Sequence, residues 1–300
     1  MDQQASPSLP TMNFHELKTA IPAHLFKCSN VASLRLLVRD IVLSFILAYG
    51  VLRLDTVWWF QGLVLTGIWV IGHECGHGSL FTSQRFCDII GFVCHSALWT
   101  PHFSWKITHH SHHRHHASME KDEHWVPQTR SEALIKDSVF EDTPIVTVVH
   151  LVVQQIAGFP VYLLFNVSGQ KTYPKATGNF NPFSTALFLR NQRWAVIMSN
   201  LGILLTALAV RCASIRCGGW QVFRLYGIPC LMVSHWVTMI VFLQHTDPKL
   251  PHYRRSAWNF SRGVLSTMDR DFLGWQGCFF LHNIAHFHVA HHLFPKMPLC

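Results

Sequence analysis

Long apolar runs alternate along the chain with polar segments that are rich in histidine. A helix needs roughly 20 apolar residues to cross a bilayer, and the runs that approach this length lie at about 38–54, 56–72, 143–166, 194–212 and 222–243, with a shorter one at 88–100. The pattern predicts an all-α integral membrane protein. Residues 1–37 are expected to form a cytosolic N-terminal segment without a cleavable signal, and residues 38–300 a single membrane domain.

Three histidine clusters lie beside these apolar runs. In a helix, residues at i, i+3 and i+4 share one face, so HECGH (73–77) presents two imidazoles, and HHSHH (109–113) and HVAHH (288–292) present three each. Eight imidazoles can therefore converge without a carboxylate. The spacing predicts a histidine-only metal site at the membrane surface, with the ligands His73, His77, His109, His112, His113, His288, His291 and His292.

The histidine clusters also constrain the topology, because all three must lie on one side of the membrane to build one site. The chain must then cross an even number of times between His113 and His288, although three long runs lie there. The 143–166 run holds Gln154, Gln155 and Pro160, and we expect it to lie in the interface. The prediction is about four transmembrane helices, one or two half-inserted segments and a cytosolic helical cap that carries the metal site.

Composition supports a membrane location. Hydrophobic residues make up 49% of the chain and charged residues only 13%, and the net charge is +8. The basic residues are spread over the loops rather than interleaved with aromatic residues, so we expect an anionic lipid surface or an acidic protein as partner and no nucleic acid. The nine cysteines form no CxxC pair and are expected to be free thiols.

HECGH also matches the H-E-x-x-H signature of zinc proteases, in which Glu74 would act as general base. A single zinc ion needs one further ligand and an open position for water, which leaves the other clusters without a role. Eight imidazoles suit two six-coordinate ions better, and imidazole is a ligand compatible with iron. A membrane protease therefore remains the remote alternative.

Several longer stretches resemble the membrane fatty acid desaturases, specifically the Δ12 oleate desaturase-like branch of fungi and plants. They cover nearly the whole chain: AIPAHLFK (20–27), HECGH (73–77), PHFSWKITHHSHH (101–113), EKDEHWVP (120–127), FNVSG (165–169), LQHTDPKLPHY (243–253), TMDRDF (267–272) and HNIAHFHVAHHLFPKMP (282–298). The resemblance implies two iron ions that activate O2 and remove two hydrogens from an acyl chain. It also implies endoplasmic reticulum location and a cytosolic active site.

The family resemblance assigns the three histidine clusters as iron ligands and adds His245 as a ninth, with His282 as the competing candidate. His110, His115, His116, His124 and His286 are interpreted as orienting or solvated residues. Metal-bound imidazoles usually donate their distal N–H to an orienting partner. We expect Asp122, Glu123, Asp269 and Asp271 to be candidates for that role.

Electrons must come from outside the chain, because no G-x-G-x-x-G fingerprint follows a strand and no fused haem domain is evident. The resemblance implies cytochrome b5, reduced at the expense of NADH, and an acidic partner would suit a basic cytosolic face. A fatty acyl lipid requires a narrow apolar tunnel. Trp58, Trp59, Phe60, Trp69 and Trp99 are candidates for its wall, and equally for a membrane-interface belt.

Two features depart from the family pattern. Relatives continue for several tens of residues beyond the third cluster, whereas this chain ends eight residues after His292, so a truncated or non-catalytic paralogue is an alternative. Gly72 stands where ordinary oleate desaturases have Ala, and Gly there resembles members that hydroxylate, conjugate or make triple bonds. Removing a methyl beside the metals would shift the acyl chain, which makes Gly72 a product-tuning candidate.

Overall fold

The structure, a computed structural model, describes residues 14–54, 58–129 and 143–298, which form helices joined by turns and loops. The long and medium helices are α2 (Asn30–Leu54), α3 (Trp58–His77), α4 (Gln84–Ser96), α5 (His102–His115), α7 (Pro144–Phe165), α8 (Arg193–Cys217) and α10 (Ile228–His245). The short ones are α1 (Phe14–Ala20), η1 (Ala23–Phe26), η2 (Arg190–Gln192), α9 (Gly219–Val222), the π-helical turn η3 (Phe223–Gly227), α11 (Phe260–Val264), α12 (Trp275–Phe280) and α13 (His288–Leu293). Within these ranges no β-strand occurs.

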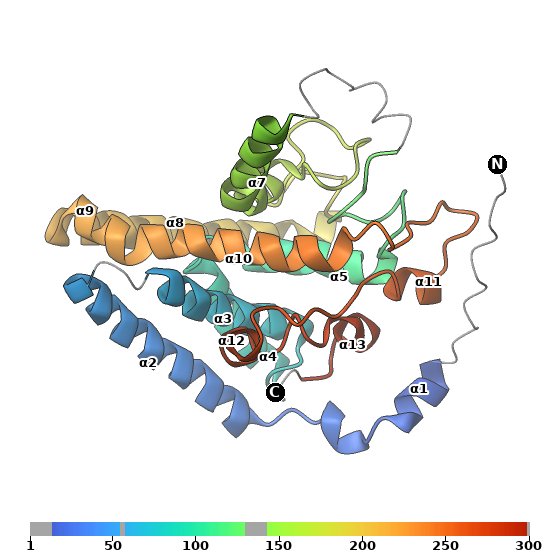
Figure 1. The fold of residues 1–300 in the computed structure, drawn as a ribbon, viewed down its shortest axis with the longest axis horizontal. Coiled ribbons are helices and arrows are strands. Elements are labelled where there is room, and N and C mark those ends of the chain that lie inside the picture. Colours follow the sequence, from blue (N-terminus) through green and yellow to red (C-terminus); the bar gives the residue numbers. More distant parts are fainter. Residues whose placement is uncertain (1–13, 55–57, 130–142, 299–300) are drawn as a thin grey trace.

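Helix α3 lies at the centre of the bundle. It packs against α2, α4 and α10, and α10 in turn packs against α7 (Figure 1). The largest core cluster joins α3, α5, α7 and α10 through side chains such as Trp69, Trp105, Tyr162 and Trp236. The short helices α11 and α13 lie together near one end of the bundle, beside the C-terminal part of α5 (Figure 1). Residues distant in the sequence therefore meet at this end.

Two prolines inside the helical segments each remove one backbone hydrogen bond, and a neighbouring helix replaces it. Proline lacks an N–H, so Pro160 cannot bond the Ile156 carbonyl and Pro229 cannot bond the Leu225 carbonyl. Ser234 Oγ donates to the Ile156 oxygen at 3.0 Å, and the Gln61 amide donates to the Leu225 oxygen at 2.9 Å. Because a bilayer offers no water to carbonyls freed in this way, these contacts hold α7 and α3 against α10.

Three helical segments are long and apolar enough to cross a membrane: Pro144–Phe165, Arg190–Cys217 and Gly219–His245. The segment expected to lie in the interface is among the three, because its two glutamines leave it apolar overall, and its placement in the interface stays a prediction. Helices α2 and α3, which correspond to two of the apolar runs in the sequence, are not among the three, since α2 carries four charged residues and α3 ends in HECGH. The number of spans therefore stays a prediction.

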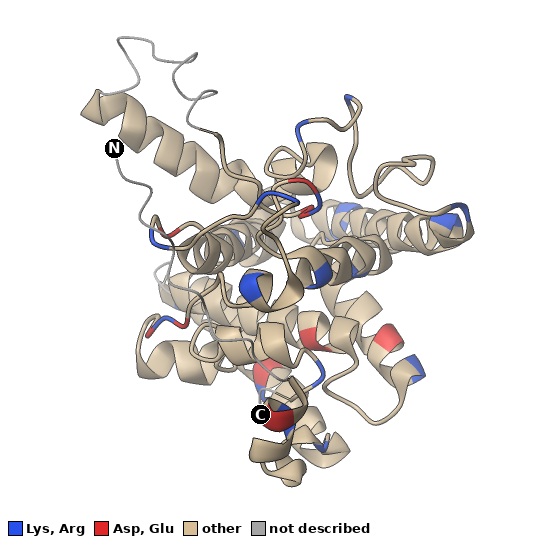
Figure 2. Cartoon of the chain, turned by 90° about the vertical axis from the view of Figure 1, so that its right-hand side faces the viewer, with Lys and Arg blue, Asp and Glu red and all other residues tan. Residues whose placement is uncertain are grey.

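Charged residues are sparse over the long helices, and many lie near helix ends and in the connecting loops (Figure 2). The eight described cysteines are all free thiols, as the sequence predicted. Cys300 and residues 1–13 of the expected cytosolic segment lie outside the described residues.

Candidate metal centre

The three histidine clusters lie on three different helices. HECGH forms the C-terminal turns of α3, the second cluster lies on α5, and the third fills α13. A six-residue helix such as α13 is not stable alone. Asp269 accepts a hydrogen bond from the Val289 backbone N–H at 2.8 Å in its first turn, and this contact fixes where the third cluster begins.

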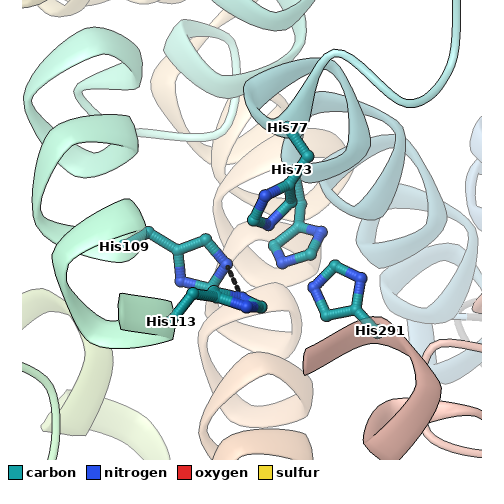
Figure 3. Close-up of side chains that lie close together, drawn as sticks. All are labelled: His73, His77, His109, His113 and His291. Carbon is teal, nitrogen blue, oxygen red and sulfur yellow. Dashed lines mark hydrogen bonds between the residues drawn. The ribbon is translucent and has the colours of Figure 1, made fainter. Parts of the chain in front are cut away.

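Group one consists of five buried histidines from these three helices: His73, His77, His109, His113 and His291. One ring nitrogen of each lies within 4.8 Å of one nitrogen of every other. The rings face a common centre between α3, α5 and α13 (Figure 3). His109 Nε2 and His113 Nε2 are only 3.1 Å apart. The first two histidine clusters therefore meet the third cluster, which is distant from them in the sequence, at one point.

Group two consists of five further buried histidines: His112, His116, His245, His288 and His292. His245, at the end of α10, belongs to both of the overlapping triplets that make up this group. The Nε2 atom of His288 lies 3.1 Å from those of His245 and His292. The two groups touch, because the His113 and His292 rings stack with centroids 4.2 Å apart.

Both groups fit transition-metal ions. A neutral imidazole has one N–H and one lone pair, and several nitrogens in these groups have no hydrogen-bond partner among the described residues, including His77 Nε2, His245 Nδ1 and both nitrogens of His291. Nitrogens bonded to one ion at about 2.1 Å and at right angles lie about 3 Å apart, which matches the 3.1 Å separations in both groups. Imidazole-only sets suit iron, zinc and copper.

The structure brings all nine predicted ligands into the two groups, and their role as ligands stays a prediction. It also divides the second and third clusters between the two groups. His109 and His113 lie in group one but His112 in group two. His291 lies in group one, whereas His288 and His292 lie in group two. The competing candidate His282 lies apart, bonded to Asp40 at 2.8 Å.

His116 was predicted to lie outside the ligand set, but it belongs to group two. Its Nε2 is 3.0 Å from the Ser266 carbonyl, and its Nδ1 is 3.4 Å from an Asp122 oxygen. The sequence did indicate that His116 lies near the ligands, because it follows His112 at the i+4 spacing that places two rings on one helix face.

Each group has one buried carboxylate that orients an imidazole. Glu74 accepts from Ser79 Oγ at 2.6 Å and lies 2.9 Å from His73 Nδ1. Asp122 lies 2.8 Å from His112 Nδ1. Burial alone would raise the pKa of Asp122, but the adjacent His112 and His116 rings outweigh this and hold it well below its usual range.

The other predicted carboxylates have different contacts. Asp269 bonds the backbone of α13 rather than an imidazole. Asp271 is exposed and lies 3.2 Å from His286, which belongs to neither group. Glu123 contacts the Tyr173 hydroxyl at 3.4 Å. Only Asp122 of these four therefore contacts a predicted ligand imidazole.

A mostly apolar cavity reaches the histidines between α3, α5, α7 and α10. Its wall includes His73, His109, His112, His245 and His288 from the two groups. Aromatic and aliphatic side chains form much of the remainder, among them Trp69, Trp105, Phe159, Val237, Ile240 and Phe242. Of the five aromatic residues that the sequence offered for a tunnel wall, Trp69 is the one that lines this cavity. An apolar chain that entered here would end beside both groups.

Gly72 faces away from this cavity. A Cβ atom built there would lie 2.3 Å from Cδ2 of His95, a fully buried residue of α4. The His95 ring stacks on Trp69 with centroids 5.2 Å apart, and its Nε2 is 3.0 Å from the Trp69 carbonyl. Gly72 would therefore affect the acyl chain indirectly, because a side chain there would displace His95 and, through it, Trp69. The sequence did not indicate these contacts.

Comparison with known proteins agrees with this geometry. Residues 55–300 match the family model described as fatty acid desaturase. A Delta(12) fatty acid desaturase of Mortierella isabellina is 39% identical, with 97% of this chain and 79% of the relative covered. An oleoyl-12-hydroxylase of Ricinus communis is 38% identical (99% and 79% covered), and an oleate hydroxylase of Claviceps purpurea 35% (96% and 68%). The chain belongs to the fatty acid desaturase family.

Proposed function

We propose that this chain is an oxygen-dependent acyl-lipid desaturase that introduces a double bond into a chain such as oleoyl, in the manner that the names of its Δ12 relatives indicate. The observation that carries the proposal is the meeting of two buried histidine groups at the wall of an apolar cavity. Breaking an unactivated C–H bond needs a strong oxidant held beside a bound hydrocarbon. A paired metal site next to an apolar cavity meets both requirements.

The nine predicted ligands would hold two iron ions, five residues in group one and four in group two. Iron bound there supplies the oxidising chemistry, with O2 as oxidant and external electrons. Glu74 and Asp122 fix the orientation of His73 and His112 by accepting from their distal nitrogens. Trp69 and Trp105 exclude water and position the acyl chain, since both line the cavity and Trp105 stacks on His109 at 4.3 Å.

The cellular setting is part of the same proposal. We infer a multi-pass protein of the endoplasmic reticulum membrane whose histidine groups face the cytosol, with residues 38–300 as one membrane domain. Cytochrome b5, reduced by NADH, would supply the electrons. The net charge of +8 and the Lys and Arg residues in the loops (Figure 2) support docking of an acidic electron carrier.

Hydroxylation is the second candidate function, because two of the relatives are named as hydroxylases that act on oleoyl or oleate. Acetylenase or conjugase activity, or a non-catalytic paralogue, would keep the same fold.

The geometry favours all of these desaturase-like functions over a zinc protease. A single zinc ion would use only part of one histidine group and would leave the adjacent group without a role.

The test is expression of the 300-residue chain in yeast that lacks Δ12 activity, followed by gas chromatography with mass spectrometry of the fatty acids. A new linoleate, or an oxidised, conjugated or acetylenic oleate, that disappears in a His112→Ala control supports the proposal. Purified protein should also contain about two irons per chain. Stable expression with no new fatty acid and no bound iron would favour a non-catalytic paralogue.

A further inference from the structure

The cavity beside the histidine groups has an unusual wall for a hydrocarbon tail. Apart from the histidines of the two groups, three of its lining residues carry a buried polar atom without a hydrogen-bond partner among the described residues: His124 Nε2, Thr238 Oγ1 and Gln244 Oε1. A hydrocarbon that filled the cavity would leave such atoms dry and unpaired, which is costly. A ligand with hydrogen-bonding groups would satisfy them.

His124 is held rigidly at the junction of the two groups. Its backbone N–H donates to Asp122 at 3.0 Å, and its carbonyl accepts from Ser168 Oγ at 2.6 Å. Its ring stacks on His112 with centroids 4.7 Å apart and meets Tyr162 edge-on at 4.8 Å. The ring thus has a fixed position in the cavity wall, with the unpaired Nε2 next to a predicted metal ligand.

Thr238 lacks the side-chain to backbone hydrogen bond that other threonines of this bundle form. A helical threonine often bonds the carbonyl four residues earlier, as Thr66 does with Gly62 and Thr246 with Phe242, each at 2.7 Å. Thr238 forms no such bond. Across from it on α7 lies Gly158, where a Cβ atom would be 3.3 Å from Thr238 Cγ2 and 3.5 Å from Oγ1. Both residues line the cavity.

The two polar points lie at different depths. Thr238 precedes His245 by seven residues on α10, which corresponds to about 10 Å along a helix. His124 lies level with the histidine groups, because its ring stacks on His112 and that ring is 5.0 Å from His245. A chain lying along the cavity would therefore pass one polar point beside the reacting carbons and a second one farther along.

We propose that the acyl chain this protein takes carries oxygen substituents, hydroxyl, keto or epoxide groups, and that His124 hydrogen-bonds one beside the reacting carbons and Thr238 one farther along the chain. The inference rests on the proposed acyl-lipid activity and narrows its substrate class. A neutral imidazole either donates or accepts at Nε2, and a threonine hydroxyl does both, so each suits an oxygen substituent. Sites built to bond a substrate hydroxyl discriminate strongly against the analogue without it.

The experiment uses the full chain in lipid nanodiscs with reductase and cytochrome b5. Oleoyl chains and chains with one hydroxyl or keto group at a series of positions compete on the same headgroup, and mass spectrometry gives their relative kcat/KM. The wild-type protein should prefer one oxygenated chain by at least about tenfold. His124→Phe keeps the stacked ring and should reduce the preference for a chain whose oxygen lies beside the reacting carbons. Thr238→Val keeps the shape and should reduce the preference for a chain whose oxygen lies farther along. Each reduction should be several-fold and mainly through KM.

Thr206→Val is the matched control, because its hydroxyl donates to the Ser96 carbonyl and it lines a different cavity. This variant should keep the wild-type preference. Preference of the wild type for plain chains would overturn the inference. So would equal loss of turnover on both chain types together with loss of iron from His124→Phe, because that result assigns His124 to positioning of the metal site.

Failure of the proposed activity can be told apart from failure of this inference. If no chain is turned over, the change in melting temperature on adding hydroxystearoyl or stearoyl lipid still measures recognition. A larger increase with the hydroxylated chain that Thr238→Val abolishes would support the inference without catalysis. Equal shifts with the two lipids would contradict it.

Discussion

The two histidine groups are built in different ways although they touch each other. Group one takes four of its five members from the long helices α3 and α5, and its orienting carboxylate, Glu74, lies within the HECGH motif itself. Group two takes one member from α10 and two from α13, and its carboxylate, Asp122, comes from the loop after α5. The first group is mainly a product of helical spacing and the second of tertiary packing.

The difference indicates which group is more sensitive to the surrounding structure. Asp122 accepts the backbone N–H groups of Ala117 and His124 in addition to contacting His112. It therefore couples the loop conformation to group two. Among the described residues, the hydrogen bonds of Glu74 stay within its own helix and the residues that directly follow it, and it also lies 3.7 Å from His291. Changes in the loops should reach group two first, and the predictions below test that order.

Removal of one histidine from each group should have the largest effect. His77→Ala and His112→Ala should each lower activity by more than about 100-fold, since even an orienting partner is worth 10–100-fold. Each should also lower bound iron from about two towards one per chain. Product analysis and metal analysis of the purified variants measure the two effects. Full iron content with full activity in either variant would contradict the ligand assignment.

The two carboxylates should differ in size of effect. Asp122→Asn should cost about 10–100-fold in activity or iron affinity, because the new amide NH2 would face the donors that Asp122 accepts. Glu74→Gln should cost less, since the Ser79 hydroxyl can reverse its hydrogen bond. Iron titration of both proteins checks this. A greater loss from Glu74→Gln would reverse the proposed order of the two groups.

His116 and His282 separate metal positioning from packing. His116→Asn should lower activity about tenfold while iron stays near two per chain, as expected of an orienting residue. Iron near one per chain would instead make His116 a ligand.

His282→Asn should keep iron but lower stability by about 3 kcal/mol, because it breaks the buried pair with Asp40. Metal analysis and thermal unfolding in detergent measure both.

The smallest effect is expected next to group one, at Gly72. Gly72→Ala must displace the His95 ring and through it Trp69, so the product ratio should change while iron content stays constant. His95→Ser creates space for the new methyl, so the effects of the two changes should be non-additive by about 1 kcal/mol. Gly219→Ala, where a Cβ atom meets nothing within 4 Å, is the control. Additive effects would exclude the relay through His95.

The sequence by itself determined the helical class, the three histidine clusters and, through the resemblance of longer motifs, the family. The first two follow from local rules: apolar length predicts the membrane helices, and i, i+3, i+4 spacing places histidines on one helix face. The same spacing rule places His116, four residues after His112, on the same helix face.

Only the tertiary structure decided how the histidines divide. Adjacent residues such as His112 and His113 point about 100° apart on a helix, so one box serves two centres, and the packing of α10 and α13 against α5 determines which ring joins which group. The same holds for Gly72, whose missing side chain accommodates His95 rather than an acyl chain. Local spacing determines the direction of a side chain, whereas the partner it meets depends on contacts between residues far apart in the chain.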